Sequence, residues 1–477
     1  MRVFRNGEEM FKQKKPVEQG LQIIIVGCGK VGQTLIAQLI KEGHNITLID
    51  KNQQKIQELT NLYDVMGVVG NGASFSVQKE ADIDHTDLII AVTDSDELNL
   101  LCCTVAKRVG NCSAIARVRT PDYSMEANYL RERLGLAMII NPELEASREM
   151  ARILYLPTAL EVDTFAHGQA EMIKFKVPEE NLLDGMMVAD LGKTVGKNIA
   201  DNVLICAVER DSEIYIPSGN FRILRGDCIS FVSTRRDAKS FLEKIGFKTH
   251  AVKNTMIIGG GKSSYYLATQ LLHMGISVKI IDSNPKRCEE LSILLPKAVI
   301  INGDGTNEEL LREEGIEYVE SFVPLTGIDE ENILLTLHAR HVSHAKVITK
   351  INRTNYKGVL GGLNMDSVIY PRYIASEAIV AYVRAKKASM NSSNIETLYH
   401  MFDFRVEAIE FRVKSESPVT NIPLAQLSLK KGLLISFINR RGTIIIPSGQ
   451  DSIQVGDTVM IVTTHTGFKV LQDILND

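Results

Sequence analysis

Short runs of apolar residues, separated by amphipathic stretches, recur through the first third of the chain. The runs IIIVG, NITLID, VMGVVG, LIIAVT, AIARV and AMIINP all lie between residues 23 and 142. Near-continuous apolar strands spaced by helical stretches are typical of a parallel sheet that is covered on both faces. Because parallel strands are joined by right-handed crossovers, the pattern predicts a doubly wound α/β domain over residues 21–153.

A shorter segment with a different rhythm follows at residues 159–247. It contains the alternating runs EMIKFKV, VLICAVE, EIYIPSG and CISFVS, and its last helix is predicted near Asp237–Lys244. The pair Gly226-Asp227, just before the last run, is a turn signal because glycine accepts a positive φ. The pattern predicts a small α/β domain.

The whole pattern then repeats. TMIIGGGKSSYYLATQLLHMGISVKIID restates QIIIVGCGKVGQTLIAQLIKEGHNITLID, and both the loop glycines and the closing aspartates are 232 positions apart, since 259 − 27 = 282 − 50 = 232. IARVRTPDY and the later IPSG…GD strands recur at nearly the same offset. So long a period indicates a duplicated two-part unit rather than a solenoid.

The predicted fold class is therefore α/β, with two tandem Rossmann-like doubly wound parallel-sheet domains, each followed by a small α/β domain. The predicted domains cover residues 21–153, 159–247, 253–387 and 395–477. The polar stretch Lys386–Asn394 is the expected linker before the last of them.

The loop GCGKVG follows the first predicted strand and precedes a predicted helix. In a dinucleotide-binding loop, the first glycine makes a tight turn, the second lets the backbone approach a pyrophosphate, and the third lets the helix pack on the strand. These three roles fall on Gly27, Gly29 and Gly32. The helix N-terminus behind the loop then offers free N–H groups to phosphate.

Asp50 ends the second predicted strand, about 20 residues after the loop, where a carboxylate binds a ribose 2′-hydroxyl. Its charge would repel a 2′-phosphate, so the sequence favours NAD(H) over NADP(H). The same carboxylate would accept the ribose of ATP or ADP. A Rossmann-like scaffold that binds no ligand is the alternative interpretation.

The second loop, Gly259–Ser264, is followed by Asp282 but departs from the first loop at one position. Ser264 stands where the first copy has Gly32, and a side chain there crowds the packing of helix on strand. The ribose aspartate is retained, so the sequence leaves open whether this loop binds nucleotide. A P-loop is excluded because Met256 occupies the position of its first glycine.

Further polar residues follow the third, fourth and fifth predicted strands of each half. Ligands of open parallel sheets bind at the carboxyl ends of the strands, so these residues are candidate nucleotide contacts. A guanidinium among them could neutralise phosphate. They are Asn71, Thr93, Asp94 and Arg117 in the first half, and Asp304, Thr326, Gly327 and Lys350 in the second.

Composition excludes several function classes. The net charge of −4 and the lack of a dense Lys/Arg tract do not favour nucleic-acid binding. The seven cysteines are scattered without CxxC spacing, which favours a reducing cytoplasm over a disulfide framework or a zinc site. The apolar runs are strand-sized and the N-terminus has no apolar core, so we expect neither a membrane span nor a secretory signal. A membrane role would need a partner.

Catalytic machinery is not evident. A dehydrogenase needs a proton donor or a group that positions hydride, beyond its cofactor loop. Tyr382 and Lys386 have the spacing of short-chain dehydrogenases, but they lie in a helix beyond the sixth strand, and coincidence is the better interpretation. His338, His341 and His344 recur every third residue without an acidic or Cys ligand beside them, which favours a solvated helix end over a metal site.

These residues resemble a known family. The two-part unit is similar to an RCK module (regulator of potassium conductance), which is an NAD-binding-type domain followed by a small C-terminal domain. Two such units in one chain resemble the TrkA family, the regulatory subunits of Trk potassium-uptake systems. The resemblance extends from about residue 21 to the C-terminus, and it rests on VGCGKVG with Asp50, AVTDSDELN, IARVRTPDY and the paired IPSG…GD strands.

The resemblance implies a regulatory protein rather than an enzyme, on the cytoplasmic face of the membrane and bound to a TrkH/TrkG-type potassium transporter. It also implies a homo-oligomeric ring of modules, expected to be a tetramer, that changes shape with NAD(H) or ATP/ADP. The family's nucleotide positions fall on Gly27, Cys28, Gly29, Lys30, Val31, Asp50, Thr93, Asp94 and Arg117. In the second half they fall on Gly259, Gly261, Lys262, Ser263, Asp282, Thr326, Gly327 and Lys350.

Two other functions stay open. One is a regulatory subunit of another potassium channel or antiporter, such as a Ktr-like system, although single-module chains are more usual there. The other is a nicotinamide-dependent oxidoreductase. The first twenty residues are an unusual extension for the family and have no assigned role.

Overall fold

A computed structural model describes residues 20–211, 213–247, 249–353, 363, 365, 367–390, 394–402 and 405–476. The chain divides into two compact units. The first runs as far as Ala116 and includes Arg131–Met138, and the second comprises Arg117–Leu130 and the chain from Ile139 onward.

The first parallel sheet has six strands in the order β3-β2-β1-β4-β5-β6, as a doubly wound fold requires. At its centre, Ile25 pairs with Leu48 on one side and Ile90 on the other, and all three side chains are fully buried. The strands are β1 (Gln22–Val26), β2 (Asn45–Asp50), β3 (Met66–Val69), β4 (Leu88–Ala91), β5 (Ser113–Arg117) and β6 (Met138–Ile140).

The helices between these strands follow from apolar spacing and capping. In the first of them, Val31, Leu35 and Leu39 recur every fourth residue and are buried. The fourth begins after Ser95, whose hydroxyl accepts the Leu98 N–H at 3.1 Å. The helices are α1 (Lys30–Lys41), α2 (Gln53–Leu62), α3 (Phe75–Glu80), α4 (Asp96–Val109), α5 (Pro121–Met125), α6 (Ala127–Leu134) and α7 (Pro142–Tyr155).

The second parallel sheet repeats the order of the first, as β14-β13-β12-β15-β16-β17, which confirms the predicted duplication of the fold. Its strands are β12 (Asn254–Ile258), β13 (Ser277–Asp282), β14 (Val299–Asn302), β15 (Ser321–Pro324), β16 (Lys346–Lys350) and β17 (Ser367–Ile369). Its helices are α11 (Lys262–His273), α12 (Pro285–Leu294), α13 (Glu308–Glu313), α14 (Asp329–Val342) and α16 (Pro371–Met390).

Helix α7 packs into the core of this second parallel-sheet domain, although it follows the last strand of the first sheet. Its residues Met150 and Leu154 belong to the same buried cluster as Leu267 and Leu271 of α11. The Ser147 hydroxyl also accepts a hydrogen bond from the side chain of Gln270 at 2.7 Å. These contacts explain why the second compact unit includes α7.

Each small domain is built on a five-stranded antiparallel sheet. The first has the order β10-β9-β11-β8-β7 and the second β18-β19-β22-β20-β21. The first contains β7 (Glu161–Phe165), β8 (Ala170–Lys176), β9 (Val203–Arg210), β10 (Glu213–Tyr215), β11 (Cys228–Ser233), α8 (Leu191–Val195), α9 (Lys197–Ala200) and α10 (Arg235–Lys244). The second contains β18 (Ile395–Met401), β19 (Val406–Arg412), β20 (Leu433–Arg440), β21 (Thr443–Ile445), β22 (Thr458–Thr463) and a closing 3-10 helix at Leu471–Ile474.

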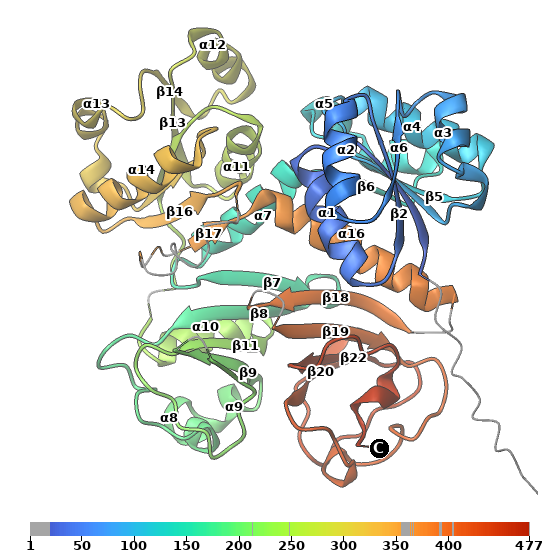
Figure 1. Cartoon of the computed structure of the whole chain (residues 1–477). Helices are drawn as coiled ribbons and strands as arrows, with labels where there is room; N and C mark the ends of the chain where they lie inside the picture. The colour runs from blue at the N-terminus through green and yellow to red at the C-terminus, as the bar shows by residue number, and fades with distance from the viewer. Residues whose placement is uncertain are drawn as a thin grey trace, which may run out of the picture. The chain divides into compact units, whose positions relative to one another are not determined.

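The sheet of the first small domain is apolar on both faces. Phe175 and Phe231 point into a core that is completed by α10. On the opposite face, Met172 and Cys206 share one buried cluster with Phe437 of the second small domain. The two small-domain sheets therefore pack against each other, and they lie side by side in Figure 1.

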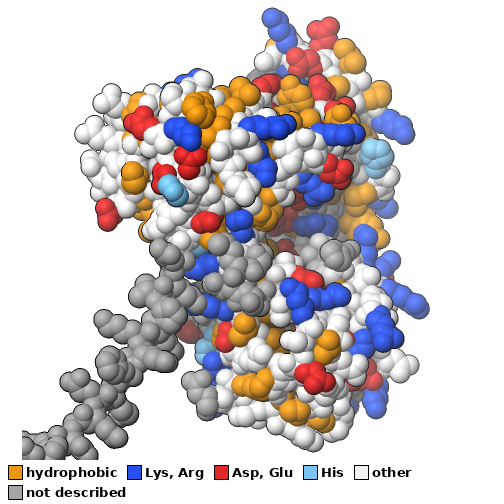
Figure 2. Space-filling model, turned by 90° about the vertical axis from the view of Figure 1, so that its right-hand side faces the viewer, with side chains coloured by type: hydrophobic (Ala, Val, Ile, Leu, Met, Phe, Trp, Pro, Cys, Tyr) orange, Lys and Arg blue, Asp and Glu red, His pale blue; other side chains and the backbone are white. Residues whose placement is uncertain are grey.

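The predicted linker at Lys386–Asn394 begins inside a helix, because α16 continues to Met390. Residues 391–393 lie outside the described part of the chain. Among the described helices, none combines the length and the apolar character needed to cross a membrane. On the face drawn in Figure 2, basic and acidic side chains are interspersed.

Candidate nucleotide-binding sites

The three glycines of the first loop occupy different steric environments. Gly27 has a φ of +102°, and a Cβ there would lie 2.8 Å from the Thr93 nitrogen. A Cβ on Gly32 would lie 2.1 Å from the Gly27 carbonyl oxygen. Around Gly29, a Cβ would meet no atom within 4 Å. The first and third glycines thus permit close backbone packing, and the second leaves open space where a ligand could approach.

Asp50 holds the loop to the end of β2. Its Oδ2 accepts the Cys28 N–H at 2.7 Å, and its Oδ1 accepts the Asn52 N–H at 2.8 Å. Each carboxylate oxygen retains a lone pair for a further donor, such as a ribose hydroxyl. The carboxylate is thus fixed in position before any ligand binds.

Helix α1 begins without a side-chain cap. Its N-cap residue is Gly29, and no side chain accepts a hydrogen bond from the first turn. By contrast, α2 is capped by Asn52 and α4 by Ser95. The first N–H groups of α1 are therefore available to an anion, with the positive end of the helix dipole behind them.

The thiol of Cys28 lies in a setting that disfavours its thiolate form. The side chain is fully buried, and burial, followed by the charge of Asp50, raises the pKa of the thiol to about 12. A protonated thiol is a poor nucleophile. Cys28 thus contributes packing and a backbone N–H. The adjoining Lys30 is exposed and Val31 is buried.

At the end of β4, Thr93 is fixed by Asn99, a residue that sequence reasoning missed. The Thr93 backbone N–H and hydroxyl both donate to Asn99 Oδ1, at 2.8 and 2.7 Å, and the Asn99 amide returns a bond to the Thr93 carbonyl at 3.1 Å. The second half repeats this arrangement, with the Thr326 N–H donating to Asn332 at 2.9 Å. The repeat distance in the sequence could have identified this asparagine. Asn332 follows Asn99 by 233 positions, the same distance by which Thr326 follows Thr93 (332 − 99 = 326 − 93 = 233).

The other candidates of the first half lie in different settings. Asn71 follows β3, is exposed, and accepts the Ala73 N–H at 3.2 Å through its side chain. Asp94 is exposed beside Thr93. Arg117 is the last residue of β5 and is buried, and it belongs to the second compact unit rather than to the unit that contains the loop.

The second loop repeats the backbone turn and the aspartate contact of the first loop, and it adds a hydrogen bond from Ser264. Gly259 has a φ of +95°, and the Gly260 N–H donates to Asp282 Oδ2 at 2.6 Å. The buried Ser264 hydroxyl donates to the Gly259 carbonyl oxygen, so the serine is accommodated by a hydrogen bond across the turn. A Cβ on Gly261 would again meet nothing within 4 Å.

Several polar candidates of the second half already have partners within the chain. Lys350 donates to the Leu325 carbonyl at 2.8 Å, and burial lowers the pKa of its ammonium to about 8. Lys262 approaches the Thr120 hydroxyl at 3.3 Å. Asp304 accepts hydrogen bonds from Thr306, which lower its pKa. Ser263 is buried, and Gly327 is exposed.

Comparison with known proteins gives the same two-part repeat. The TrkA-N domain model matches residues 23–142 and 255–371, and the TrkA-C domain model matches residues 172–246 and 408–476. The solved structure of the "GsuK channel bound to NAD" is similar with a TM-score of 0.62 and 18% identity, over 94% of this chain and 78% of that chain. At that identity, the likeness shows the fold.

Curated relatives are similar over almost the whole chain. "Trk system potassium uptake protein TrkA homolog 1" of Methanosarcina mazei is 31% identical, over 92% of this chain and 97% of the relative. The TrkA homolog of Archaeoglobus fulgidus is 30% identical, over 95% of this chain and all of the relative. With both domain types present twice and relatives matched end to end, the chain belongs to the TrkA family of Trk potassium-uptake proteins.

Proposed function

We propose that this chain is a nucleotide-sensing regulatory subunit that binds NAD(H), ATP or ADP in its first glycine loop and gates a membrane potassium-uptake protein. The observation that carries the proposal is the geometry of that loop. Open space at Gly29, an uncapped helix N-terminus and a fixed carboxylate at Asp50 together form a frame for a nucleotide. No proton donor or hydride-positioning residue is assigned, so the proposed role is regulation rather than catalysis.

In this proposal the nucleotide phosphates lie at the N-terminus of α1 and the ribose lies against Asp50. The carboxylate disfavours a 2′-phosphate, so NAD(H) is expected to bind better than NADP(H). ATP and ADP carry the same ribose and phosphates. The similar GsuK channel was solved bound to NAD, which supports a nicotinamide dinucleotide among the ligands. The remaining candidate contacts of the first half are Cys28, Lys30, Val31, Asn71, Thr93, Asp94 and Arg117.

The second loop is proposed as a separate site of lower affinity. Gly261 and Asp282 retain the frame of the first loop, and Ser264 is accommodated. However, Arg287 donates to the Gly260 carbonyl at 2.6 Å, and Lys350 is bound to a backbone carbonyl. A ligand would have to compete with these bonds, which lowers its net binding energy.

The proposed partner is a TrkH/TrkG-type potassium transporter, contacted at the cytoplasmic face of the membrane by a homo-oligomeric ring of these chains. The names of the curated relatives support potassium uptake as the process. A nucleotide can move such a gate only by binding one arrangement of the ring better than the other. A shift from mostly closed to mostly open needs about 5.5 kcal/mol of differential binding, which several sites supply more easily than one.

Asp50→Asn tests the first site. The amide keeps one acceptor for the loop but loses the charge that favours the ribose hydroxyls, so we expect NADH affinity to fall by about tenfold or more. Isothermal titration calorimetry on the full chain measures the change. Asp282→Asn is the matched control in the second loop and should leave the tighter binding event unchanged. An unaltered NADH affinity in Asp50→Asn would remove Asp50 from the site.

The regulatory role is tested in cells. Deletion of the gene in a host that depends on this system should abolish potassium uptake, and Asp50→Asn should reduce the response of uptake to nucleotide. Purification of the tagged chain should recover a membrane potassium transporter. Substrate-dependent oxidation of NADH by the purified chain would instead support an oxidoreductase.

A further inference from the structure

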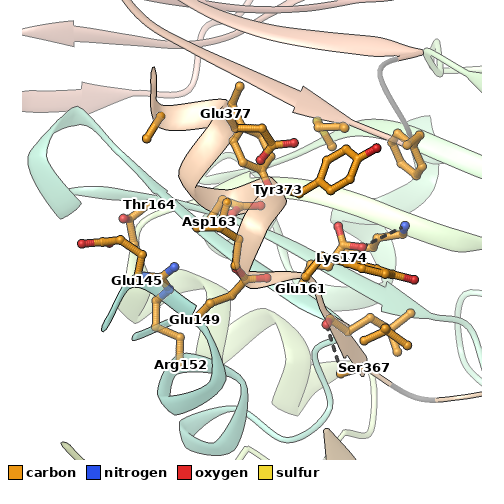
Figure 3. Close-up of a pocket in the computed structure, with 18 of the residues that line it drawn as sticks. Glu145, Glu149, Arg152, Glu161, Asp163, Thr164, Lys174, Ser367, Tyr373 and Glu377 are labelled. Atoms are coloured by element: carbon orange, nitrogen blue, oxygen red, sulfur yellow. Dashed lines mark hydrogen bonds and ion pairs between the residues drawn. The ribbon is translucent and has the colours of Figure 1, made fainter. Parts of the chain in front are cut away.

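A cavity of about 640 Å³ lies in the second compact unit, between segments from both halves of the chain. Its walls come from α7, β7 and β8 of the first half and from α16 and β18 of the second half. Figure 3 shows side chains from α7, β7 and α16 extending into the same space. The volume is in the range of small-molecule sites.

Carboxylates dominate the wall of this cavity. Two basic residues line it, Arg152 and Lys174. The six acidic residues are Glu145, Glu149, Glu161, Asp163, Glu209 and Glu377. With every group ionised, the wall carries a formal charge of 2 − 6 = −4. An uncompensated charge of this size inside a protein is costly unless a ligand or protons neutralise it.

One basic group of the wall is paired with carboxylates, and the other bonds a backbone carbonyl. The Lys174 ammonium lies 3.4 Å from Glu161 and 3.6 Å from Glu209, and it stands 4.4 Å from the centre of the Phe402 ring. The Arg152 Nε donates to the Val162 carbonyl at 3.0 Å. Lys174 therefore compensates carboxylates on β7 and β9, while six acidic residues against two basic ones leave the wall as a whole with an acidic excess.

Glu149 and Asp163 lie near Arg152, whose charge lowers the pKa of both groups, but burial and the neighbouring carboxylates outweigh that effect. Within the described part of the chain, the Glu149 carboxylate makes no hydrogen bond or ion pair, and Asp163 accepts the Tyr399 hydroxyl. Burial and the charge of neighbouring carboxylates raise the pKa of both groups, that of Asp163 to about 7. Two carboxyl groups of raised pKa that line an open space would release their protons when a cation binds between them, and the cation would then neutralise their charge.

The rest of the wall suits an organic cation better than a metal ion. Tyr370, Tyr373, Phe165 and Phe402 present aromatic surface, which attracts ammonium groups and packs against methylene chains. Among the described residues, no three His, Cys, Asp or Glu side chains converge as metal ligands. The cavity is also much larger than a single ion requires.

We propose that this cavity binds an aliphatic di- or polyamine. One ammonium group lies between Glu149 and Asp163, the methylene chain packs along the tyrosines, and a second ammonium group points toward Glu377 on α16. A ligand that joins α7 to α16 would stabilise one arrangement of the two halves of the chain. The site is distinct from the glycine loops and would exist whether or not those bind nucleotide.

Calorimetry on the full chain at about 0.15 M salt tests the proposal, because this ionic strength screens non-specific attraction to an acidic surface. The probes are spermidine, 1,4-diaminobutane, butylamine and magnesium chloride. We expect spermidine and 1,4-diaminobutane to bind at one site per chain, and butylamine, with one charge, to bind at least tenfold more weakly. Glu149→Gln and Asp163→Asn should each weaken diamine binding by about tenfold or more.

Glu179→Gln is the matched control, since Glu179 is an exposed carboxylate outside the cavity. The proposal would be overturned if Glu179→Gln weakened diamine binding as much as Glu149→Gln does. It would also be overturned if the cavity variants left diamine binding unchanged. Binding of magnesium but not of amines would replace it with a metal site. The cavity variants remove repulsion, so their melting temperatures should equal or exceed that of the parent. NADH affinity, measured on the same samples, reports separately on the glycine loop.

Discussion

At the scale of single residues, Asp227 and Asp163 show how differently an aspartate side chain can be accommodated. Asp227 is fully buried, but Arg210 donates two hydrogen bonds to it at 2.7 and 2.8 Å, and the Leu224 N–H donates a third at 2.8 Å. Asp457 and Arg440 repeat the arrangement in the second small domain. This pairing gives the recurring GD motif a physical reason. Asp163, by contrast, has no such arginine pair: Glu161 raises its pKa, and Arg152 and Lys174 lower it only in part.

The pKa of Asp163 makes a prediction about stability. Burial, and then the charge of Glu161, raise it from 3.8 to about 7. The folded chain therefore keeps a proton where the unfolded chain has lost it, so this contribution to stability is complete below about pH 4 and is lost as the pH rises through about 7. Between pH 5 and pH 8 we expect Asp163→Asn to lose less stability than the parent.

Urea denaturation of the parent and Asp163→Asn at both pH values measures this difference. The pH dependence also includes the groups that share the site with Asp163, which are Glu149 and Arg152 on α7, Glu161 on β7, Lys174 on β8 and Tyr399 on β18. Glu179→Gln should follow the parent at both pH values. If the parent and Asp163→Asn lost equal stability, the carboxyl group of Asp163 would not be protonated in the folded state near neutral pH.

At the scale of elements, the strand–loop–helix unit is the same in both halves but tolerates different side chains. In the first copy, α1 packs so closely on the turn that a Cβ at Gly32 would overlap the Gly27 carbonyl. In the second copy, the turn before α11 carries Ser264, whose hydroxyl bonds the corresponding carbonyl of Gly259. The conformation of the loop therefore depends less on a glycine at the position of Gly32 than on the aspartate that accepts the N–H of the loop's second residue, Cys28 or Gly260.

Two alanine variants test separately the glycine that allows the helix to pack and the glycine that leaves space for a ligand. Gly32→Ala should destabilise the chain by about 2 kcal/mol, because the methyl group meets backbone that cannot move aside easily. Gly29→Ala should leave stability within about 0.5 kcal/mol, since its φ of −72° suits alanine and its Cβ meets open space. The same variant should weaken NADH binding, because the methyl group occupies the space proposed for the pyrophosphate.

Chemical denaturation and calorimetry on both variants provide the two measurements. A Gly29→Ala chain that is both stable and unchanged in NADH affinity would show that the pyrophosphate does not approach this glycine. A Gly32→Ala chain as stable as the parent would show that the turn can relax as it does around Ser264.

At the scale of the whole molecule, the second compact unit unites segments that are distant in sequence. The two small domains share one core, to which Met172 and Cys206 contribute from one and Phe437 and Val462 from the other. Helix α7 likewise joins the core of the second parallel sheet. The packing of the two halves is therefore interdependent, because a side chain of one half cannot change size without disturbing a core that the other half shares.

The shared core makes a prediction about cysteine reactivity. Phe437→Ala should destabilise the chain by about 3–5 kcal/mol and, in native conditions, should increase the rate at which Cys206 reacts with a thiol reagent. Mass spectrometry of the labelled peptides identifies the cysteine. Phe241→Ala removes the same volume from the core on the other face of the β8–β9–β11 sheet, and it should leave Cys206 protected. Equal labelling in both variants would contradict protection by the second small domain.

The elements themselves could be predicted from sequence because their signals are local. The apolar runs at Ile23–Val26 and Asn45–Asp50, the glycine loops and the fixed repeat distance predict strands, turns and duplication without knowledge of distant contacts. The polar run Lys386–Asn394 was expected to be a linker, but its first five residues belong to α16, which continues to Met390. The polar composition of that stretch therefore did not locate the end of the helix.

The sequence by itself determined the fold class, the doubling of the chain and the candidate nucleotide loops, because each is encoded within about thirty consecutive residues or in a repeat of such a stretch. Only the tertiary structure decided which surfaces meet. Glu149, Asp163, Glu377 and Tyr399 come from four separate elements, and nothing in their spacing predicts that they share a cavity. The acidic pocket exists because α7 and α16 pack between sheets, and packing is set by side-chain shape over the whole core.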